Sequence, residues 1–137
     1  MEDTRYGMRV ELPVAYEQAV ERATAELKAE GFGVLTTIDV KQTIEQKLDK
    51  DFRKYVILGA CNPPIAYQAL CAETELGLLL PCNVIIYETE PGRSVVATVA
   101  PLVTMSRVGN EALAPLGQQV DAKLRRVLSA LEAGEAR

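Results

Sequence analysis

The sequence predicts an α+β fold in which a five-stranded, mostly antiparallel sheet packs on a long C-terminal helix. Three observations support this class. The elements run in the order β-α-β-α-β-α-β-β-α, which stops alternating near the end of the chain. The last two strands form a hairpin, and the final helix carries a long apolar stripe. With 137 residues the chain has the length of one domain, so we expect a single domain over residues 1–137.

The first three elements follow from residue spacing. Apolar and charged residues alternate over residues 6–12, which is typical of a half-buried strand. Pro13 suits the first turn of a helix whose apolar residues recur at helical spacing, and Gly31 suits its end. Residues 32–38 are rich in β-branched side chains, which predicts the second strand.

The middle of the chain predicts two helices around a buried strand. Asp39 is expected to cap a short helix with Val40, Ile44 and Leu48 on one stripe. Residues 52–60 have a centre that is apolar on both faces, so this third strand is expected inside the sheet. Asn62 then reads as the N-cap of a helix that extends to about residue 75.

The last third of the chain predicts the hairpin and the long helix. Residues 83–89 and 93–99 are strands joined by a Glu-Pro-Gly turn at residues 90–92. Residues 102–108 are ambiguous and are compatible with a helical turn. The final helix is expected over residues 112–132. Its apolar stripe comprises Leu113, Leu116, Val120, Leu124, Val127 and Leu131.

Composition excludes several classes of protein. The net charge is −4 and the basic residues are scattered, so we expect no nucleic-acid partner. The chain has no histidine, which excludes Ser-His-Asp and Cys-His catalysis and metal sites with imidazole ligands. We expect no metal site, and the sequence identifies no cofactor. Three cysteines do not make a secreted disulfide framework. Without a membrane span or signal segment, we expect a soluble cytoplasmic protein and no membrane partner.

Two cysteine motifs are the most informative feature. Cys61 is followed by Asn62 and Pro63 after the third strand, and Cys82 is followed by Asn83 at the start of the fourth. If these strands are antiparallel neighbours, both cysteines lie at one end of the sheet; a parallel crossover would put them at opposite ends. Tyr55 shares a strand face with Cys61 and is expected to line the same pocket.

Two interpretations of the cysteines stay open. Buried cysteine often acts only as a small apolar side chain, and Asn-Pro before a helix is ordinary capping. Alternatively, free amides such as those of Ile65 and Ala66 at the helix start favour a thiolate or a bound anion, to which Asn83 adds a donor. A disulfide between Cys61 and Cys82 is a further option. Cys71, in the middle of a helix, is expected to be structural.

The "ACNP" and "LLPCN" motifs, with "GFGVLTTIDV" before them, resemble the uncharacterised family Domain of Unknown Function 302 over about residues 5–132. The resemblance implies a TATA-binding-protein-like fold with a curved antiparallel sheet around a long C-terminal helix, and it implies no established activity. The family's motif positions correspond here to Cys61, Asn62, Pro63, Leu80, Pro81, Cys82 and Asn83. The acidic chain argues against the DNA binding that the fold suggests.

Three functions fit these observations. The favoured hypothesis is a small-molecule binding module, with a homodimeric assembly and a pocket rimmed by Cys61 and Cys82. The second is a thiol enzyme or redox sensor in which Cys61 is the nucleophile. The third is a structural or interaction module that dimerises through an exposed edge strand or helix face.

Overall fold

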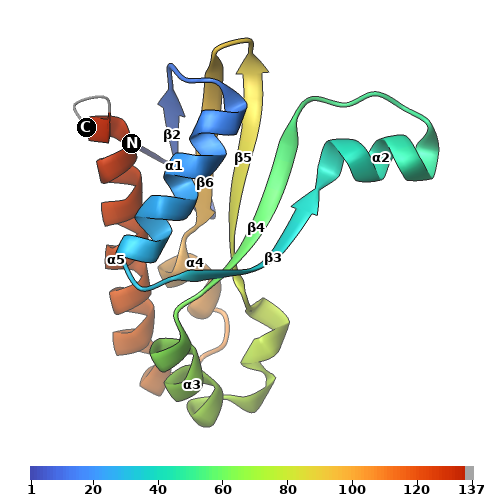
Figure 1. The fold of residues 1–137 in the computed structure, drawn as a ribbon. Coiled ribbons are helices and arrows are strands. Elements are labelled where there is room, and N and C mark those ends of the chain that lie inside the picture. The colour runs from blue at the N-terminus through green and yellow to red at the C-terminus, as the bar shows by residue number, and fades with distance from the viewer. Residues whose placement is uncertain (135–137) are drawn as a thin grey trace.

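The computed structural model describes residues 1–134 and contains one six-stranded antiparallel sheet. The strand order is β1-β2-β6-β5-β4-β3, so the first two strands lie at one edge and β3 lies at the other (Figure 1). The strands are β1 (Glu2–Asp3), β2 (Gly7–Leu12), β3 (Gly33–Asp39), β4 (Tyr55–Cys61), β5 (Cys82–Glu90) and β6 (Arg93–Val99). The predicted α+β class with an antiparallel sheet is therefore confirmed.

Five α-helices and two 3-10 turns connect and cover these strands. The helices are α1 (Tyr16–Ala29), α2 (Val40–Leu48), α3 (Pro63–Ala72), α4 (Pro101–Met105) and α5 (Ala114–Ala133) within the described part of the chain. The 3-10 turns are η1 (Thr74–Leu79) and η2 (Glu111–Leu113).

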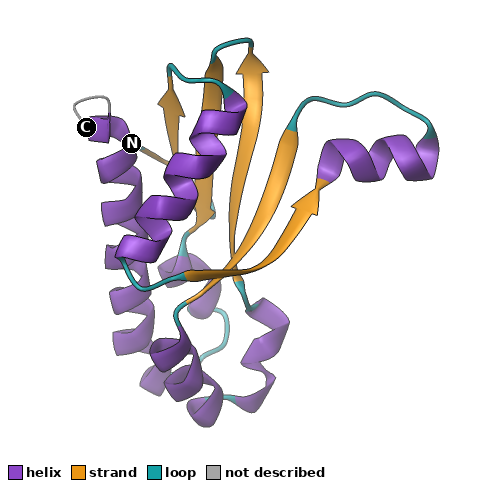
Figure 2. Cartoon of the chain, viewed as in Figure 1, coloured by secondary structure: helices purple, strands orange, loops and turns teal. Residues whose placement is uncertain are grey.

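One face of the sheet is covered by α1 and α5 (Figure 2). Alternate strand residues point toward these helices, as the period of two in a strand requires. The covered strand residues include Met8, Val10, Leu58, Val84, Ile86 and Val96. From α5, the buried residues Leu124, Val127 and Leu131 of the predicted stripe complete the core, together with Leu128, which the stripe did not include.

The opposite face of the sheet, called here the open face, carries the other set of alternate residues. Across the strands these form a row in which Ile38 lies beside Ile57, Ile57 beside Ile85, and Ile85 beside Ala97. Ile38 is exposed, and the other three side chains are partly exposed. The sheet therefore presents apolar groups on a side that neither α1 nor α5 covers.

The structure corrects the predicted element list at several points. The sheet has six strands, not five, because the two-residue β1 pairs with Arg9 and Met8 of β2. All of its strand pairs are antiparallel, where mostly antiparallel pairing was expected. The helix predicted to reach residue 75 ends at Ala72, and η1 follows it. The ambiguous segment contains the short helix α4.

The short helix predicted after Asp39 exists, but its apolar stripe is not buried. Asp39 Oδ1 accepts a hydrogen bond from the backbone amide of Gln42 at 2.9 Å, which is the expected N-cap. No residue of α2 is buried, and β3 is exposed along almost its whole length. Together β3, α2 and the return segment to residue 54 form a projection, called here the arm (Figure 1).

Candidate functional site

The antiparallel pairing of β4 and β5 brings the two cysteine motifs to one end of the sheet. Ala60 lies opposite Cys82 and Gly59 lies opposite Asn83, so Cys61 is one residue beyond the Ala60–Cys82 pair. The first of the two arrangements considered from the sequence is thus the one that the chain adopts. The three cysteines are free thiols.

Strand alternation divides the second motif between the two faces of the sheet. Cys82 is paired with the buried Ala60 and lies on the helix-covered side, where its side chain is buried. Asn83 is paired with Gly59 and is exposed on the open face. The two adjacent residues therefore belong to two different cavities.

The first cavity, called here the cysteine pocket, lies between α3, η1 and the covered side of the sheet. Its volume is about 290 Å³, and its lining includes Cys61, Cys82 and Asn62. The rest of the wall is largely apolar and includes Phe32, Ile65, Ala69, Leu80, Met105 and Val120. Two thiols and one amide thus face a space that is otherwise hydrocarbon, a surface suited to an apolar ligand with few polar groups.

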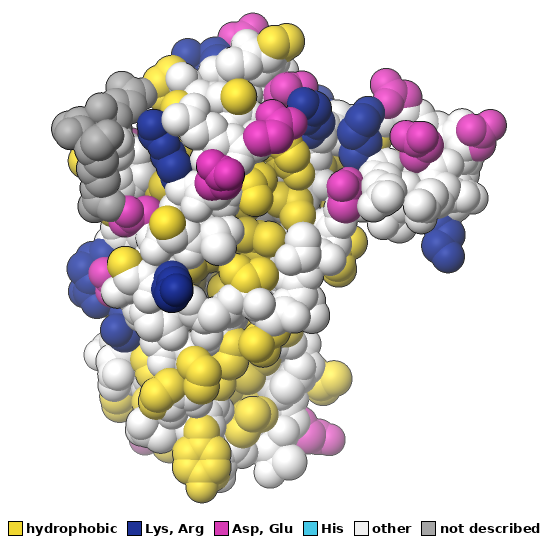
Figure 3. Space-filling model, in the orientation of Figure 1, with side chains coloured by type: hydrophobic (Ala, Val, Ile, Leu, Met, Phe, Trp, Pro, Cys, Tyr) yellow, Lys and Arg dark blue, Asp and Glu magenta, His cyan; other side chains and the backbone are white. Residues whose placement is uncertain are grey.

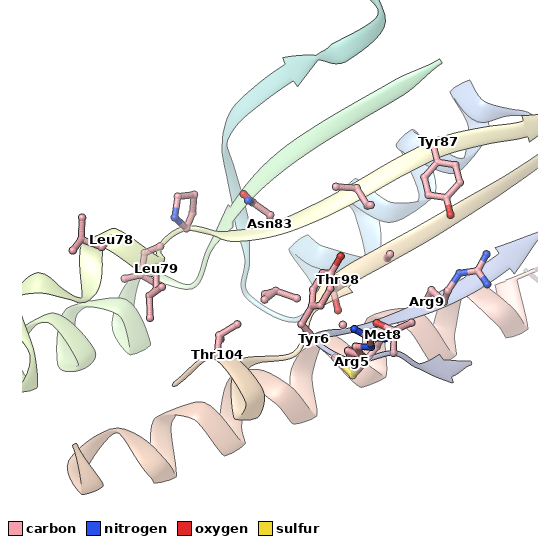
Figure 4. Close-up of a pocket in the computed structure, with 17 residues that line it drawn as sticks. Arg5, Tyr6, Met8, Arg9, Leu78, Leu79, Asn83, Tyr87, Thr98 and Thr104 are labelled. Atoms are coloured by element: carbon pink, nitrogen blue, oxygen red, sulfur yellow. The ribbon is translucent and has the colours of Figure 1, made fainter. Parts of the chain in front are cut away.

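The second cavity, called here the open-face groove, runs along the other side of the sheet. Its volume is about 760 Å³. Leu78 and Leu79 lie at one end of the groove, while Arg9 and Tyr87 lie toward the other (Figure 4). Arg9 Nη1 donates to Glu2 Oε1 at 2.9 Å, and this bond raises the pKa of the Arg9 guanidinium. Of the two arginines that line the groove, Arg5 and Arg9, Arg9 is therefore already paired with a carboxylate.

Leu80 and Pro81 form part of the wall of both cavities. The peptide bond between them is cis. Pro81 packs against Gly59 so closely that a Cβ at residue 59 would lie 2.8 Å from Pro81 Cγ. Only glycine leaves room for this approach, because carbon atoms in contact normally stay about 3.5–4.0 Å apart.

Asn62 stands at the predicted N-cap position of α3, but its side chain does not cap the helix. Its Nδ2 instead donates to the backbone oxygen of Glu30, at 3.4 Å, and so links α3 to the end of α1. Pro63 and Pro64 have no amide hydrogen, and the Ala66 amide donates to Asn62 O at 2.9 Å. The first turn of α3 therefore offers fewer free donors to a thiolate or an anion than the sequence suggested.

Tyr55 and Pro63 do not join the cysteines. Tyr55 begins β4, six residues before Cys61, and its ring stacks on that of Tyr87 with centroids 5.5 Å apart. Burial and the neighbouring Tyr87 raise the pKa of Tyr55. Pro63 is exposed at the start of α3, and neither residue lines the cysteine pocket. Tyr55 is paired with Tyr87, which lines the open-face groove, so both its face and its distance along the strand separate Tyr55 from the cysteine pocket.

Burial sets the chemistry of Cys82. Desolvation, with a smaller contribution from neighbouring Cys61, raises the pKa of the Cys82 thiol to about 11. Cys82 is therefore a neutral thiol near pH 7, whereas Cys61 is only half-buried and Cys71 is exposed. Among the described residues, no three His, Cys, Asp or Glu side chains lie where they could hold a metal ion together.

These environments predict an order of thiol reactivity. In the native protein at pH 8 we expect iodoacetamide to alkylate Cys71 fastest, then Cys61, with Cys82 far slower, because about one Cys82 thiol in a thousand is ionised at that pH. Alkylation of Cys82 should rise steadily with pH up to about 11. Peptide mass spectrometry after timed labelling measures the three rates. Denatured protein is the control, where the rates should converge; equal native rates for Cys71 and Cys82 would contradict this assignment.

Several residues of the cysteine pocket were not predicted from the sequence. Val120 was identified only as part of the stripe of α5, and Phe32 only as the first residue of a strand. Met105 lay in the ambiguous segment. Their shared role depends on contacts between distant segments, for which spacing in the sequence gives no signal.

The chain has relatives whose structure is known. A crystal structure of an uncharacterised conserved DUF302 protein from Bacillus stearothermophilus superposes with a TM-score of 0.83 at 28% sequence identity. The alignment covers 92% of this chain and 98% of that one. A search of curated proteins returned no match. No helix within residues 1–134 has both the length and the apolar character needed to cross a membrane.

The family model described as "Domain of unknown function DUF302" matches residues 8–131, which include the whole of the cysteine pocket and both cysteine motifs. The chain therefore belongs to the DUF302 family.

Proposed function

We propose that the protein is a small-molecule binding module whose ligand occupies the cysteine pocket. The observation that carries this proposal is the cavity of about 290 Å³ lined by Cys61, Cys82 and Asn62. Its volume is close to the lower end of the roughly 300–1,000 Å³ that is usual for ligand sites. The ligand that fits is small and mostly apolar.

The pocket wall supports this ligand class. Burial of apolar ligand surface against Phe32, Ile65 and Val120 supplies the main favourable free energy. The neutral Cys82 thiol is a weak donor and acceptor, and it avoids placing a charge beside an apolar ligand. A charged ligand would lose its hydration without a paired counter-charge in this wall, so we expect weak binding of anions.

A thiol enzyme is the second hypothesis, and Cys61 is the residue that it requires. Its partial exposure and its place in the pocket wall favour this idea. Two possible sources of activation for this chemistry are removed. The raised pKa of Cys82 keeps that thiol neutral, and the Ala66 amide already donates to Asn62 O, so it is not free to stabilise a thiolate. Binding without chemistry at sulfur is therefore the function that we favour.

Filling the pocket tests the proposal. We expect Ala66→Leu to weaken the binding of a small apolar probe such as indole at least tenfold, because Ala66 lines the pocket and is only half-buried. Ala72→Leu, an exposed substitution at the end of the same helix, is the matched control and should bind as the parent does. Titration of isotope-labelled protein by NMR measures both affinities and locates the perturbed residues.

Two results would overturn the proposal. One is the absence of indole binding at millimolar concentration by the parent protein. The other is equal binding by the parent and Ala66→Leu, which would place the probe elsewhere, such as in the open-face groove. Circular dichroism of each variant excludes loss of fold as the reason for lost binding.

A further inference from the structure

The arm contains a helix with no fully buried residue, although Val40 and Ile44 are half-buried. α2 has nine residues, and none of them is buried by the rest of the protomer. The arm is nevertheless held together internally, because Lys41 Nζ donates to Asp51 Oδ1 and to Phe52 O, each at 2.7 Å. Figure 1 shows α2 standing away from the body formed by the sheet, α1 and α5.

A nine-residue helix with no fully buried residue lacks much of its usual source of stability. Helices shorter than about 12–15 residues are marginal in water, and in proteins the packing of an apolar face supplies most of their stability. The arm instead exposes its large apolar side chains, with Leu35 66% and Leu48 63% accessible. Ile38 and Phe52 are exposed as well. Leu35 also lines the cysteine pocket, whereas Ile38, Leu48 and Phe52 line neither cavity. Exposed apolar side chains outside the cavities indicate an interaction surface.

The arm also presents an unprotected sheet edge. β3 is the terminal strand, and over Gly33–Asp39 it contains neither lysine nor proline; its one charge is the last residue. The pairing of β3 with β4 shifts register between Val34 and Thr36, so the regularly paired part of this edge strand is residues 36–39. The other edge, β1, is two acidic residues long. Short and charged edges resist pairing with another chain, whereas a longer uncharged edge invites it.

The charges of the arm indicate what occupies this surface. Residues 39–54 include five basic and four acidic residues, and Figure 3 shows both signs over the arm. This near-neutral mixture does not favour a nucleic acid or an anionic membrane, each of which selects clustered cations. Because five basic and four acidic residues leave a charge of only +1 on residues 39–54, a second copy meets little net repulsion at the arm even though the chain carries a net charge of −4.

We propose that the arm is the dimerisation surface, and that its partner is the arm of a second copy of this chain. Two β3 edges pair antiparallel about a two-fold axis, an arrangement in which the same patch serves both protomers. The two arms then bury the exposed side chains of Ile38 and Leu48 against each other. The sheet continues from one protomer into the next through residues 36–39.

Charged substitutions on the arm test this interface in the full-length protein. Leu48→Glu and Ile38→Glu change side chains that are exposed in the protomer and line neither cavity, so the fold should persist by circular dichroism. The control is Leu78→Glu, because Leu78 is 86% exposed and lies in η1, outside the arm. Sedimentation velocity over a concentration series measures the dimer dissociation constant for each protein.

We expect the parent and Leu78→Glu to sediment as dimers of twice 15.0 kDa, and each arm variant to dissociate at least tenfold more readily. Amide exchange in β3 should also slow as the concentration of the parent rises. A parent that stays monomeric at about 200 µM, a concentration at which specific dimers persist, would overturn the proposal. So would a dimer that Leu78→Glu disrupts and the arm variants do not, which would place the interface at the open-face groove.

Discussion

Replacing Leu124 with alanine is expected to lower the free energy of unfolding by about 2–5 kcal/mol, a large part of the stability of a domain this size. Leu124 is fully buried on α5, where the helix packs against the covered face of the sheet. The substitution removes apolar contact and leaves a cavity that the surrounding elements fill only in part. Urea denaturation monitored by circular dichroism measures the change.

Leu78→Ala is the matched control for this prediction. The same three carbon atoms are removed from a side chain that is 86% exposed, so the free energy of unfolding should change by less than about 0.5 kcal/mol. Equal losses for the two variants would show that α5 does not hold the sheet as described.

The second large effect is expected at Gly59, where alanine should lower the free energy of unfolding by about 1–3 kcal/mol through overpacking. The new Cβ would meet both Pro81 Cγ and the Thr36 side chain, so Pro81 or β3 must move. Since Pro81 belongs to the walls of both cavities, indole binding should weaken as well. Urea denaturation and the NMR titration measure the two effects.

Two further variants isolate the cause. Gly33→Ala places the same methyl group on neighbouring β3, where nothing lies within 4 Å, and should be nearly neutral. Adding Thr36→Ala to Gly59→Ala removes one of the two clashes and should recover part of the lost stability. If Gly33→Ala is as destabilising as Gly59→Ala, strand propensity and not close packing is responsible.

The parts of the fold that depend on local periodicity were predictable. The alternation of Met8, Val10 and Leu12 identified β2, and the stripe through Leu124 and Val127 identified α5. The antiparallel sheet followed from the hairpin and the order of the elements. These features come from residues a few positions apart, so the sequence carries their signal directly.

Other parts required tertiary information. β1 is too short and too polar to show a pattern, and it forms because β2 offers an edge to Glu2 and Asp3. The apolar stripe of α2 has the spacing of a buried helix face, but no residue of α2 is buried. Periodicity predicts an apolar face and does not say whether another element packs against it. The close contact between Pro81 and Gly59 depends on the register between β4 and β5, which no local sequence pattern specifies.

The candidate site was predicted in outline only. The meeting of Cys61 and Cys82 followed from one topological condition that the sheet satisfies. The separation of Asn83 from Cys82 also follows from strand alternation, but only once the start of β5 is known to lie at Cys82. Tyr55 was assigned to the pocket from its spacing to Cys61 alone, but it lies at the far end of β4 and faces the open side with Tyr87, apart from the cysteine pocket.

The placement of Cys82 and Asn83 on opposite sides of β5 has an evolutionary consequence. Substitution at either position alters one cavity and leaves the lining of the other intact. A single-residue insertion or deletion between Leu80 and Cys82 would instead exchange the inner and outer side chains along the strand until a bulge absorbed it. We therefore expect relatives of this protein to vary in the identity of these residues more readily than in the length of the segment that carries them.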